Sequence, residues 1–188
     1  MRERRSGLNR RRGGWLREII EIILIALVIT FVVQTWLFET FVVEGDSMLD
    51  TLRDGDRVLV NKFLFNLREP ERGDIVVFPY PDQTERELIK RVVAVSGEVV
   101  EMQEGDLFIN GNRVSEDYLT RRGAETFPPV RVPARSVYVL GDNRENSDDS
   151  RSFGPISQDT LTGRTSLVFW PPDAFSVLGG EEFPCLDP

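Results

Sequence analysis

Apolar residues run almost without interruption from Ile19 to Phe38, and the rest of the chain shows shorter apolar segments. Only four polar residues interrupt this run: Glu21, Thr30, Gln34 and Thr35. Twenty helical residues span about 30 Å, which matches the hydrocarbon core of a bilayer. Apolar residues cover every face of such a helix from Ile22 to Val33, unlike the polar-faced helix that lies on a membrane surface. The pattern predicts a transmembrane anchor over residues 19–38.

Basic residues gather before the apolar run, and acidic residues dominate after it. Residues 1–18 hold seven Arg and two Glu, a net charge of +5, whereas the remainder carries 16 positive and 29 negative side chains, so the chain totals −8. The positive-inside rule then predicts a cytoplasmic N-terminus and an extracytoplasmic main domain at the cell membrane. A cleavable signal peptide is the alternative, but no small-residue cleavage site follows the run. The acidic main domain argues against a nucleic-acid partner.

Short β-branched segments separated by Gly and Pro predict an antiparallel β domain over residues 39–172. These segments are 41–43, 57–60, 75–78, 88–95, 99–102, 107–109, 137–140 and 165–170. Gln103–Asp106 predicts a hairpin turn, and Asn110-Gly111 predicts a type I′ turn. We expect a mainly β fold, a partly closed barrel behind one N-terminal helix. Residues 115–130 are expected to be irregular, and residues 173–188 a loose tail.

Candidate chemistry is narrowed by the absence of histidine and by the presence of only two lysines, Lys62 and Lys90. Ser-His-Asp triads, Cys-His pairs and His-based zinc sites are therefore excluded. A serine nucleophile would need a lysine or carboxylate base, and a lysine serves only if burial keeps it neutral. Lys90 lies inside an apolar strand, on the same face as Leu88 and Val92. We therefore prefer it to Lys62, although a lysine at a sheet edge is the alternative for Lys90.

Four segments, in this order behind a single anchor, carry a resemblance to a known family. They are Gly45–Met48 with Thr51-Leu52, Arg72–Phe78, Lys90–Val93, and Gly141–Arg151 continuing to Gly154-Pro155-Ile156. Together they resemble type I signal peptidases, the membrane-anchored serine–lysine proteases that remove signal peptides from exported proteins. The resemblance implies an endopeptidase that cuts after an Ala-x-Ala site. Its implied partners are the signal peptides of preproteins and the lipid bilayer, and no cofactor or metal is expected.

The resemblance also implies roles for single residues. Ser47 corresponds to the nucleophile, and Lys90 corresponds to the general base that later protonates the leaving amine. The backbone N–H of Ser47 should help to hold the oxyanion. Some relatives add a serine hydroxyl two residues before the nucleophile, where this chain has Gly45. The supporting residues are Ser147, expected to orient the lysine, Asp149 and Arg151 as an ion pair, Asp142 of the same loop, and Arg91.

An extended substrate is expected to pair with the strand edges near 41–46 and 86–90. Candidate substrate-binding residues are Phe41, Val43, Gly45, Met48, Leu52, Leu88 and Ile89, with ordinary core packing as the alternative for the apolar ones. Relatives usually have proline where this chain has Asp50. Asp50 lacks the fixed φ of proline, and a carboxylate near the lysine would favour its charged form. We expect weakened activity or altered specificity.

Other functions remain open at this point. A self-cleaving repressor-type peptidase would share the chemistry, but it should carry a DNA-binding module and no anchor. A membrane-tethered β module or an inactive homologue would need neither Ser47 nor Lys90. Asp142, Asp148 and Asp149 could bind a metal, although a loop tied by Arg144 and Arg151 is preferred. The single Cys185 cannot form an internal disulfide.

Overall fold

The computed structural model describes residues 14–49, 51–81 and 83–179. The chain divides into two compact units, Met1–Leu37 and Phe38–Pro188. Helix α1 (Gly14–Trp36) belongs to the first unit, so the helix ends before the predicted limit and Phe38 already starts a strand. Trp15 and the large apolar side chains from Ile19 to Phe31 are exposed. In the described part of the chain, no helix is both long and apolar enough to cross a membrane.

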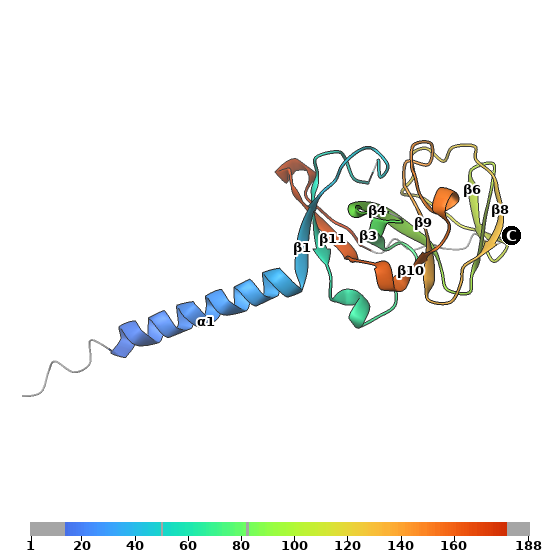
Figure 1. Ribbon diagram of the computed structural model, residues 1–188. Coiled ribbons are helices and arrows are strands. Elements are labelled where there is room, and N and C mark those ends of the chain that lie inside the picture. Colours follow the sequence, from blue (N-terminus) through green and yellow to red (C-terminus); the bar gives the residue numbers. More distant parts are fainter. Residues whose placement is uncertain (1–13, 50, 82, 180–188) are drawn as a thin grey trace, which may run out of the picture. The chain divides into compact units, whose positions relative to one another are not determined.

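The larger sheet of the second unit has eight strands, all paired antiparallel (Figure 1). Their order is β1 (Phe38–Val42), β2 (Arg57–Asn61), β11 (Gly163–Trp170), β3 (Ile75–Tyr80), β4 (Gln83–Val95), β9 (Ser136–Leu140) and β10 (Ile156–Ser157), with β12 (Ser176–Val177) beside β11. This order is a linear path and not a ring. The antiparallel, mainly β fold is confirmed, whereas the described sheet is open and closure into a barrel is not.

A smaller sheet of four strands lies at the other end of this unit from β1 (Figure 1). Its order is β7 (Asn112–Arg113), β6 (Asp106–Ile109), β5 (Val99–Gln103) and β8 (Phe127–Arg131). Asn110 and Gly111 have φ values of 53° and 81°, as a type I′ turn requires. The expectation that residues 115–130 are irregular is wrong at its end, because β8 is a strand. Its two prolines are tolerated because, among the described strands, β8 pairs with β5 alone and so lies at an edge.

Helical turns are short in this unit. They are η1 (Leu64–Asn66), α2 (Ser150–Phe153), η2 (Gln158–Thr160) and η3 (Pro172–Ala174). Because η3 and β12 follow residue 171, the expected loose tail is ordered in its first part. Residues 180–188, with Cys185, lie outside the described residues.

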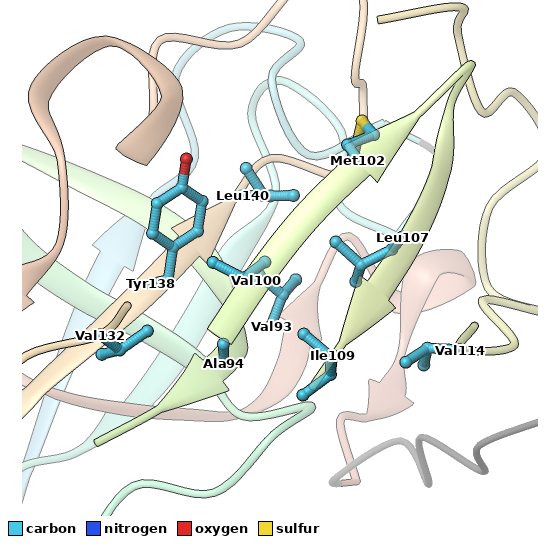
Figure 2. Packing of buried hydrophobic residues seen from close by; sticks show 10 residues of the cluster. All are labelled: Val93, Ala94, Val100, Met102, Leu107, Ile109, Val114, Val132, Tyr138 and Leu140. Atoms are coloured by element: carbon cyan, nitrogen blue, oxygen red, sulfur yellow. The ribbon is translucent and has the colours of Figure 1, made fainter. Parts of the chain in front are cut away.

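Apolar side chains from both sheets meet in one buried cluster (Figure 2). Strands β5 and β6 turn alternate residues inward, toward residues of β4 and β9. The members are Val93, Ala94, Val100, Met102, Leu107, Ile109, Val114, Val132, Tyr138 and Leu140. This core holds the end of β9 at Leu140, so it fixes the point where the polar loop 141–149 begins.

Candidate active site

Ser47 lies on a tight turn that follows β1. The turn is closed by hydrogen bonds from Leu49 N to Asp46 O (3.2 Å) and from Leu52 N to Met48 O (2.8 Å). Gly45 enters it with φ +81°, a conformation that favours glycine. Met48 is only 1% exposed and packs in the core. The buried neighbour therefore anchors the turn, while the half-buried Ser47 stays accessible.

Lys90 lies in the interior of β4 and is 2% exposed. Its Nζ is 2.7 Å from Ser47 Oγ and donates to the carbonyl oxygen of Ile89 at 3.0 Å. Burial lowers the pKa of Lys90 to about 8, against the opposing charges of Asp149, Asp148 and Asp142. A substantial fraction of this amine is therefore neutral at mildly alkaline pH. A neutral amine at this distance can accept the proton of the serine hydroxyl.

Lys62 has a different environment, as its position after a short strand predicts. Its Nζ pairs with Glu39 Oε2 at 3.0 Å, and both side chains are more than a third exposed. A solvated, paired ammonium is a poor base. The structure thus separates the two lysines, and only Lys90 lies beside a serine hydroxyl.

The predicted supporting residues Arg91 and Asp142 form a buried ion pair. Asp142 Oδ1 accepts from Arg91 Nε at 2.9 Å and Oδ2 accepts from Nη2 at 2.7 Å, with both side chains 1% exposed. Thr51 Oγ1 also donates to Asp142 at 2.5 Å. The pair joins β4 to the loop after β9 and to the segment that follows the Ser47 turn. It therefore ties together the three segments that build the site.

Asp149 and Arg151, the other predicted pair, also lie in contact. Arg151 donates from Nε and Nη2 to the two Asp149 oxygens, at 2.8 and 2.7 Å. Burial alone would raise the pKa of Asp149, but Arg151 and the backbone N–H of Gly141 outweigh it and hold this pKa below its usual value. Asp149 also caps α2 through Arg151 N. The Asp149–Arg151 pair, which we call the charged corner, therefore fixes the end of the polar loop.

Ser147 lies close to this corner without a bond to the lysine. Its Oγ is buried, and its hydroxyl helps to lower the pKa of Asp149 as a hydrogen-bond donor to that carboxylate. A Cβ on Gly141 would come within 2.1 Å of this oxygen, so only glycine fits there. The expected role of Ser147 in orienting Lys90 remains a prediction.

Three residues that sequence reasoning did not assign help to build the site. Asn143 donates from its backbone N to Ser47 O and from Nδ2 to Asp46 O, both at 3.0 Å. It therefore fastens the polar loop to the nucleophile turn. Behind the loop, Glu116 lies buried and Tyr118 half-buried. No local pattern identifies these contacts, because the partners are far apart in the chain.

A cleft of about 640 Å³ contains both Ser47 and Lys90. Six of the seven predicted substrate-binding residues line it: Phe41, Val43, Gly45, Met48, Leu88 and Ile89. Leu52 does not, because it turns inward and is fully buried in the core, as the packing alternative proposed. Charged residues of, or next to, the predicted substrate-pairing segments 41–46 and 86–90 also line the cleft: Glu44, Asp46, Glu85, Arg86 and Glu87. Asn146 and Asp148 close it from the polar loop.

Strand pairing leaves backbone groups free beside this cleft. Gln83 and residues 87–90 of β4 pair with β3 on one side, with an irregularity between them, whereas β9 pairs with β4 only from Arg91 onward. Strand β1 pairs only with β2 among the described strands. A peptide lying in the cleft can therefore find unpaired N–H and C=O groups along β4.

Two predictions cannot be placed in this geometry. Asp50 lies outside the described residues. Among the residues that the structure does describe, no group of three or more His, Cys, Asp or Glu side chains could hold a metal ion. Asp142 and Asp149 are instead engaged by arginines.

Known proteins are similar in sequence to this chain over most of its length. Residues 16–170 match the sequence model of a family described as signal peptidase, peptidase S26. Signal peptidase I P of Bacillus subtilis subsp. natto is 37% identical over 88% of this chain and 95% of that protein. Signal peptidase I T of Bacillus subtilis (strain 168) is 39% identical over 84% of each chain. A crystal structure of a signal peptidase I from Enterococcus faecalis V583 is 35% identical, covers 52% of this chain and 97% of that one, and has a TM-score of 0.47. The chain therefore belongs to the S26 family of signal peptidases.

Proposed function

We propose that Ser47 and Lys90 form the catalytic dyad with which this serine endopeptidase removes signal peptides after an Ala-x-Ala-type site. The observation that carries the proposal is the 2.7 Å separation of Lys90 Nζ and Ser47 Oγ, inside a cleft that could hold a peptide. Burial supports the role of Lys90, because it lowers the pKa of the amine to about 8. An ordinary lysine would be almost entirely protonated at that pH.

The reaction follows from this geometry in two steps. In the first, neutral Lys90 takes the proton of Ser47 while Oγ attacks the scissile carbonyl carbon, and the resulting ammonium protonates the leaving amine as the C–N bond breaks. The signal peptide is then an ester of Ser47. In the second step Lys90 takes a proton from water, hydroxide attacks the ester carbonyl, and Ser47 regains its proton as the signal peptide leaves.

The oxyanion of each tetrahedral intermediate needs hydrogen-bond donors. The backbone N–H of Ser47 is suitable, since it donates no hydrogen bond to another described residue. The N–H of Gly45 is less suitable, because it donates to Asp54 Oδ1 at 2.7 Å. We assign the first donor to Ser47 N, and the second donor must come from another group or from water.

The substrate would bind as an extended strand along the free edge of β4. Six apolar and glycine residues line the cleft beside Ser47 and are assigned here to shallow apolar pockets for the substrate: Phe41, Val43, Gly45, Met48, Leu88 and Ile89. Small residues at the first and third positions before the cut would fit such pockets. The partners proposed are the signal peptides of exported preproteins.

We also propose that residues 19–38 anchor the chain in the cell membrane, with residues 1–18 in the cytoplasm and the catalytic domain, over 39–172, outside it. The apolar run in the sequence and the exposed apolar side chains of α1 support this assignment. The side chains of residues 32–36 and the whole of residues 1–13 lie outside the described part. Protease protection of the N-terminus in sealed inverted vesicles would contradict the proposed topology.

Cleavage of a preprotein with an Ala-x-Ala site, by the full chain in detergent, tests the dyad. We expect Ser47→Ala and Lys90→Ala each to lower the rate by about a thousandfold or more. Lys62→Ala is the matched control, because Lys62 is the other lysine and is solvated; its rate should equal that of the wild type. Equal losses in both lysine variants, or cutting by Ser47→Ala at the wild-type rate, would refute the assignment.

Asp50 supports a second candidate, a homologue with weakened activity or altered specificity. A carboxylate near Lys90 would stabilise the ammonium, and the turn after Ser47 lacks the constraint of proline. Asp50→Pro should then raise turnover or change the preferred cleavage site. An unchanged rate and an unchanged site would remove this candidate.

A further inference from the structure

Two buried charged side chains behind the polar loop, and a half-buried tyrosine bonded to them, have no part in the reaction described so far. Glu116 and Arg144 are 1% and 2% exposed, and they form two hydrogen bonds, from Nη1 to Oε2 at 3.0 Å and from Nη2 to Oε1 at 2.5 Å. Tyr118 Oη donates to Glu116 Oε1 at 2.5 Å and accepts from Arg144 Nη2 at 3.2 Å. We propose that Glu116 is a positioning residue of this peptidase, which holds the polar loop and the Arg91 side chain in their catalytic arrangement. This inference rests on the proposed dyad and extends it.

Arg144 transmits the contact to the polar loop. Its Nε donates to the carbonyl oxygen of Gly141 at 3.1 Å, at the start of the loop. Its own carbonyl oxygen accepts from Arg151 Nη1 at 2.7 Å, at the end of the loop. Arg144 therefore contacts both ends of the segment that carries Asp142, Ser147 and Asp149, the start through its side chain and the end through its backbone.

Tyr118 transmits the contact to the strand that carries the base. The Arg91 guanidinium lies over the Tyr118 ring, 3.9 Å from its centroid, so the ring and Asp142 hold Arg91 from two directions. Arg91 is the next residue after Lys90 on β4. Glu116 fixes the Tyr118 hydroxyl and therefore the ring on which Arg91 rests.

The segment that carries Glu116 is itself firmly held. Val114 and Leu140 belong to the same buried cluster, and Figure 2 shows both among the side chains that join the two sheets. Val114 N also donates to Leu107 O at 2.9 Å, and Leu119 N donates to Glu116 O at 3.0 Å. Glu116 and the start of the polar loop are therefore attached to one rigid core.

Removing the charge of Glu116 should loosen the site more than it unfolds the protein. A buried arginine without its carboxylate draws water or moves toward solvent, and it would release the carbonyl of Gly141 at the start of the loop. Burial is the largest cause of the lowered pKa of Lys90, ahead of the charges of Asp149, Asp148, Arg86 and Asp142. Water that enters beside a loosened loop would weaken this effect and raise the pKa of Lys90. Glu116 is not among those charges. A higher pKa of Lys90 in a Glu116 variant would therefore report a displaced polar loop, and not the loss of a charge that acts on Lys90.

The test measures kcat against pH for the full chain in detergent, with Glu116→Gln beside the wild type. We expect kcat to fall about tenfold or more at pH 8, KM to stay within about twofold, and the midpoint of the pH profile to move to higher pH. Asp74→Asn is the matched control, because Asp74 is also 1% exposed and paired with two arginines, Arg68 and Arg164, away from the polar loop. It should lower the melting temperature and leave the midpoint unchanged.

A wild-type kcat and midpoint in Glu116→Gln would overturn the inference, as would the same shift in Asp74→Asn. If Glu116→Gln does not fold, Tyr118→Phe tests the inference instead. It removes the hydroxyl that bonds both Glu116 and Arg144 and keeps the ring under Arg91. It should show a smaller loss of kcat and a shift to higher pH, and an unchanged profile would overturn the inference. Loss of the dyad itself is tested separately, by the wild type against Ser47→Ala.

Discussion

The pKa of Lys90 is subject to two opposing influences. Burial lowers it and favours the neutral amine, whereas nearby carboxylates raise it and favour the ammonium. Burial dominates and brings its pKa to about 8. Asp148 and Arg86 both line the cleft and act on Lys90 in opposite directions. The base is therefore tuned by side chains that can be changed one at a time.

These two residues give a prediction with a definite sign. Asp148 raises the pKa of Lys90, so Asp148→Asn should move the midpoint of the kcat profile to lower pH and increase kcat at neutral pH. Arg86 lowers the pKa of Lys90, so Arg86→Gln should move the midpoint to higher pH. Measuring kcat at saturating substrate separates this effect from changes in binding. Shifts in the same direction for both variants would contradict the prediction.

The sequence predicts the two central residues of the site better than their supports. Ser47 and Lys90 are indicated by the resemblance of four ordered segments to type I signal peptidases, because a lysine in an apolar strand could equally lie at a sheet edge. Glu116 is not indicated, since its partner Arg144 lies 28 residues away. Asn143 contacts Asp46 across 97 residues. Such pairs depend on which strands lie side by side, and the hydrophobic periodicity of the sequence does not predict strand pairing.

At the scale of elements, most strands follow from their local pattern, but their pairing does not. The segment near 165–170 reads as a strand at the end of the chain, yet β11 lies between β2 and β3. Strand β8 was hidden by Pro128 and Pro129, which only an edge position permits. Edge position is a property of the assembled sheet. Closure into a barrel also depends on how the strands assemble, so the strand pattern does not determine it.

Two glycines of the smaller sheet provide a matched test of close packing. Gly105 and Gly111 have similar φ values, 84° and 81°. A Cβ on Gly105 would lie 2.2 Å from the carbonyl oxygen of Gly123, whereas one on Gly111 would meet nothing within 4 Å. Gly111→Ala should therefore cost about 1–2 kcal/mol, for the backbone alone. Gly105→Ala should cost about 1–3 kcal/mol more. Thermal unfolding of the full chain in detergent checks the order, and equal costs would contradict it.

The link between β4 and the polar loop gives a second prediction at this scale. Asp142→Ala leaves the buried Arg91 guanidinium without its carboxylate, which should cost about 3–5 kcal/mol of folding free energy. Asp106→Ala breaks partly exposed pairs with Arg113 and Arg122. It should cost only about 0–1 kcal/mol, because solvent screens those charges. Comparable losses of thermal stability would show that the Arg91–Asp142 pair does not hold these elements together.

At the scale of the whole molecule, the site forms where three distant parts of the chain meet. The Ser47 turn follows β1, Lys90 lies in β4, and the polar loop follows β9. The cluster that joins the two sheets holds β9 and β4 together, and the Arg91–Asp142 pair connects them to the Ser47 turn. The catalytic distance is therefore a product of the entire β unit, and local sequence alone could indicate its residues but not their separation.

The most direct test of the dyad is the dependence of kcat on pH for preprotein cleavage by the intact wild-type chain. Only neutral Lys90 can accept the proton of Ser47, and its pKa is about 8. Activity should therefore rise as the pH increases through 8 and level off above it, with about a tenth of the maximum at pH 7. Lys62→Ala should give the same curve. A kcat that does not change between pH 6 and pH 9.5, roughly 1.5 to 2 units either side of that pKa, would contradict a buried lysine base.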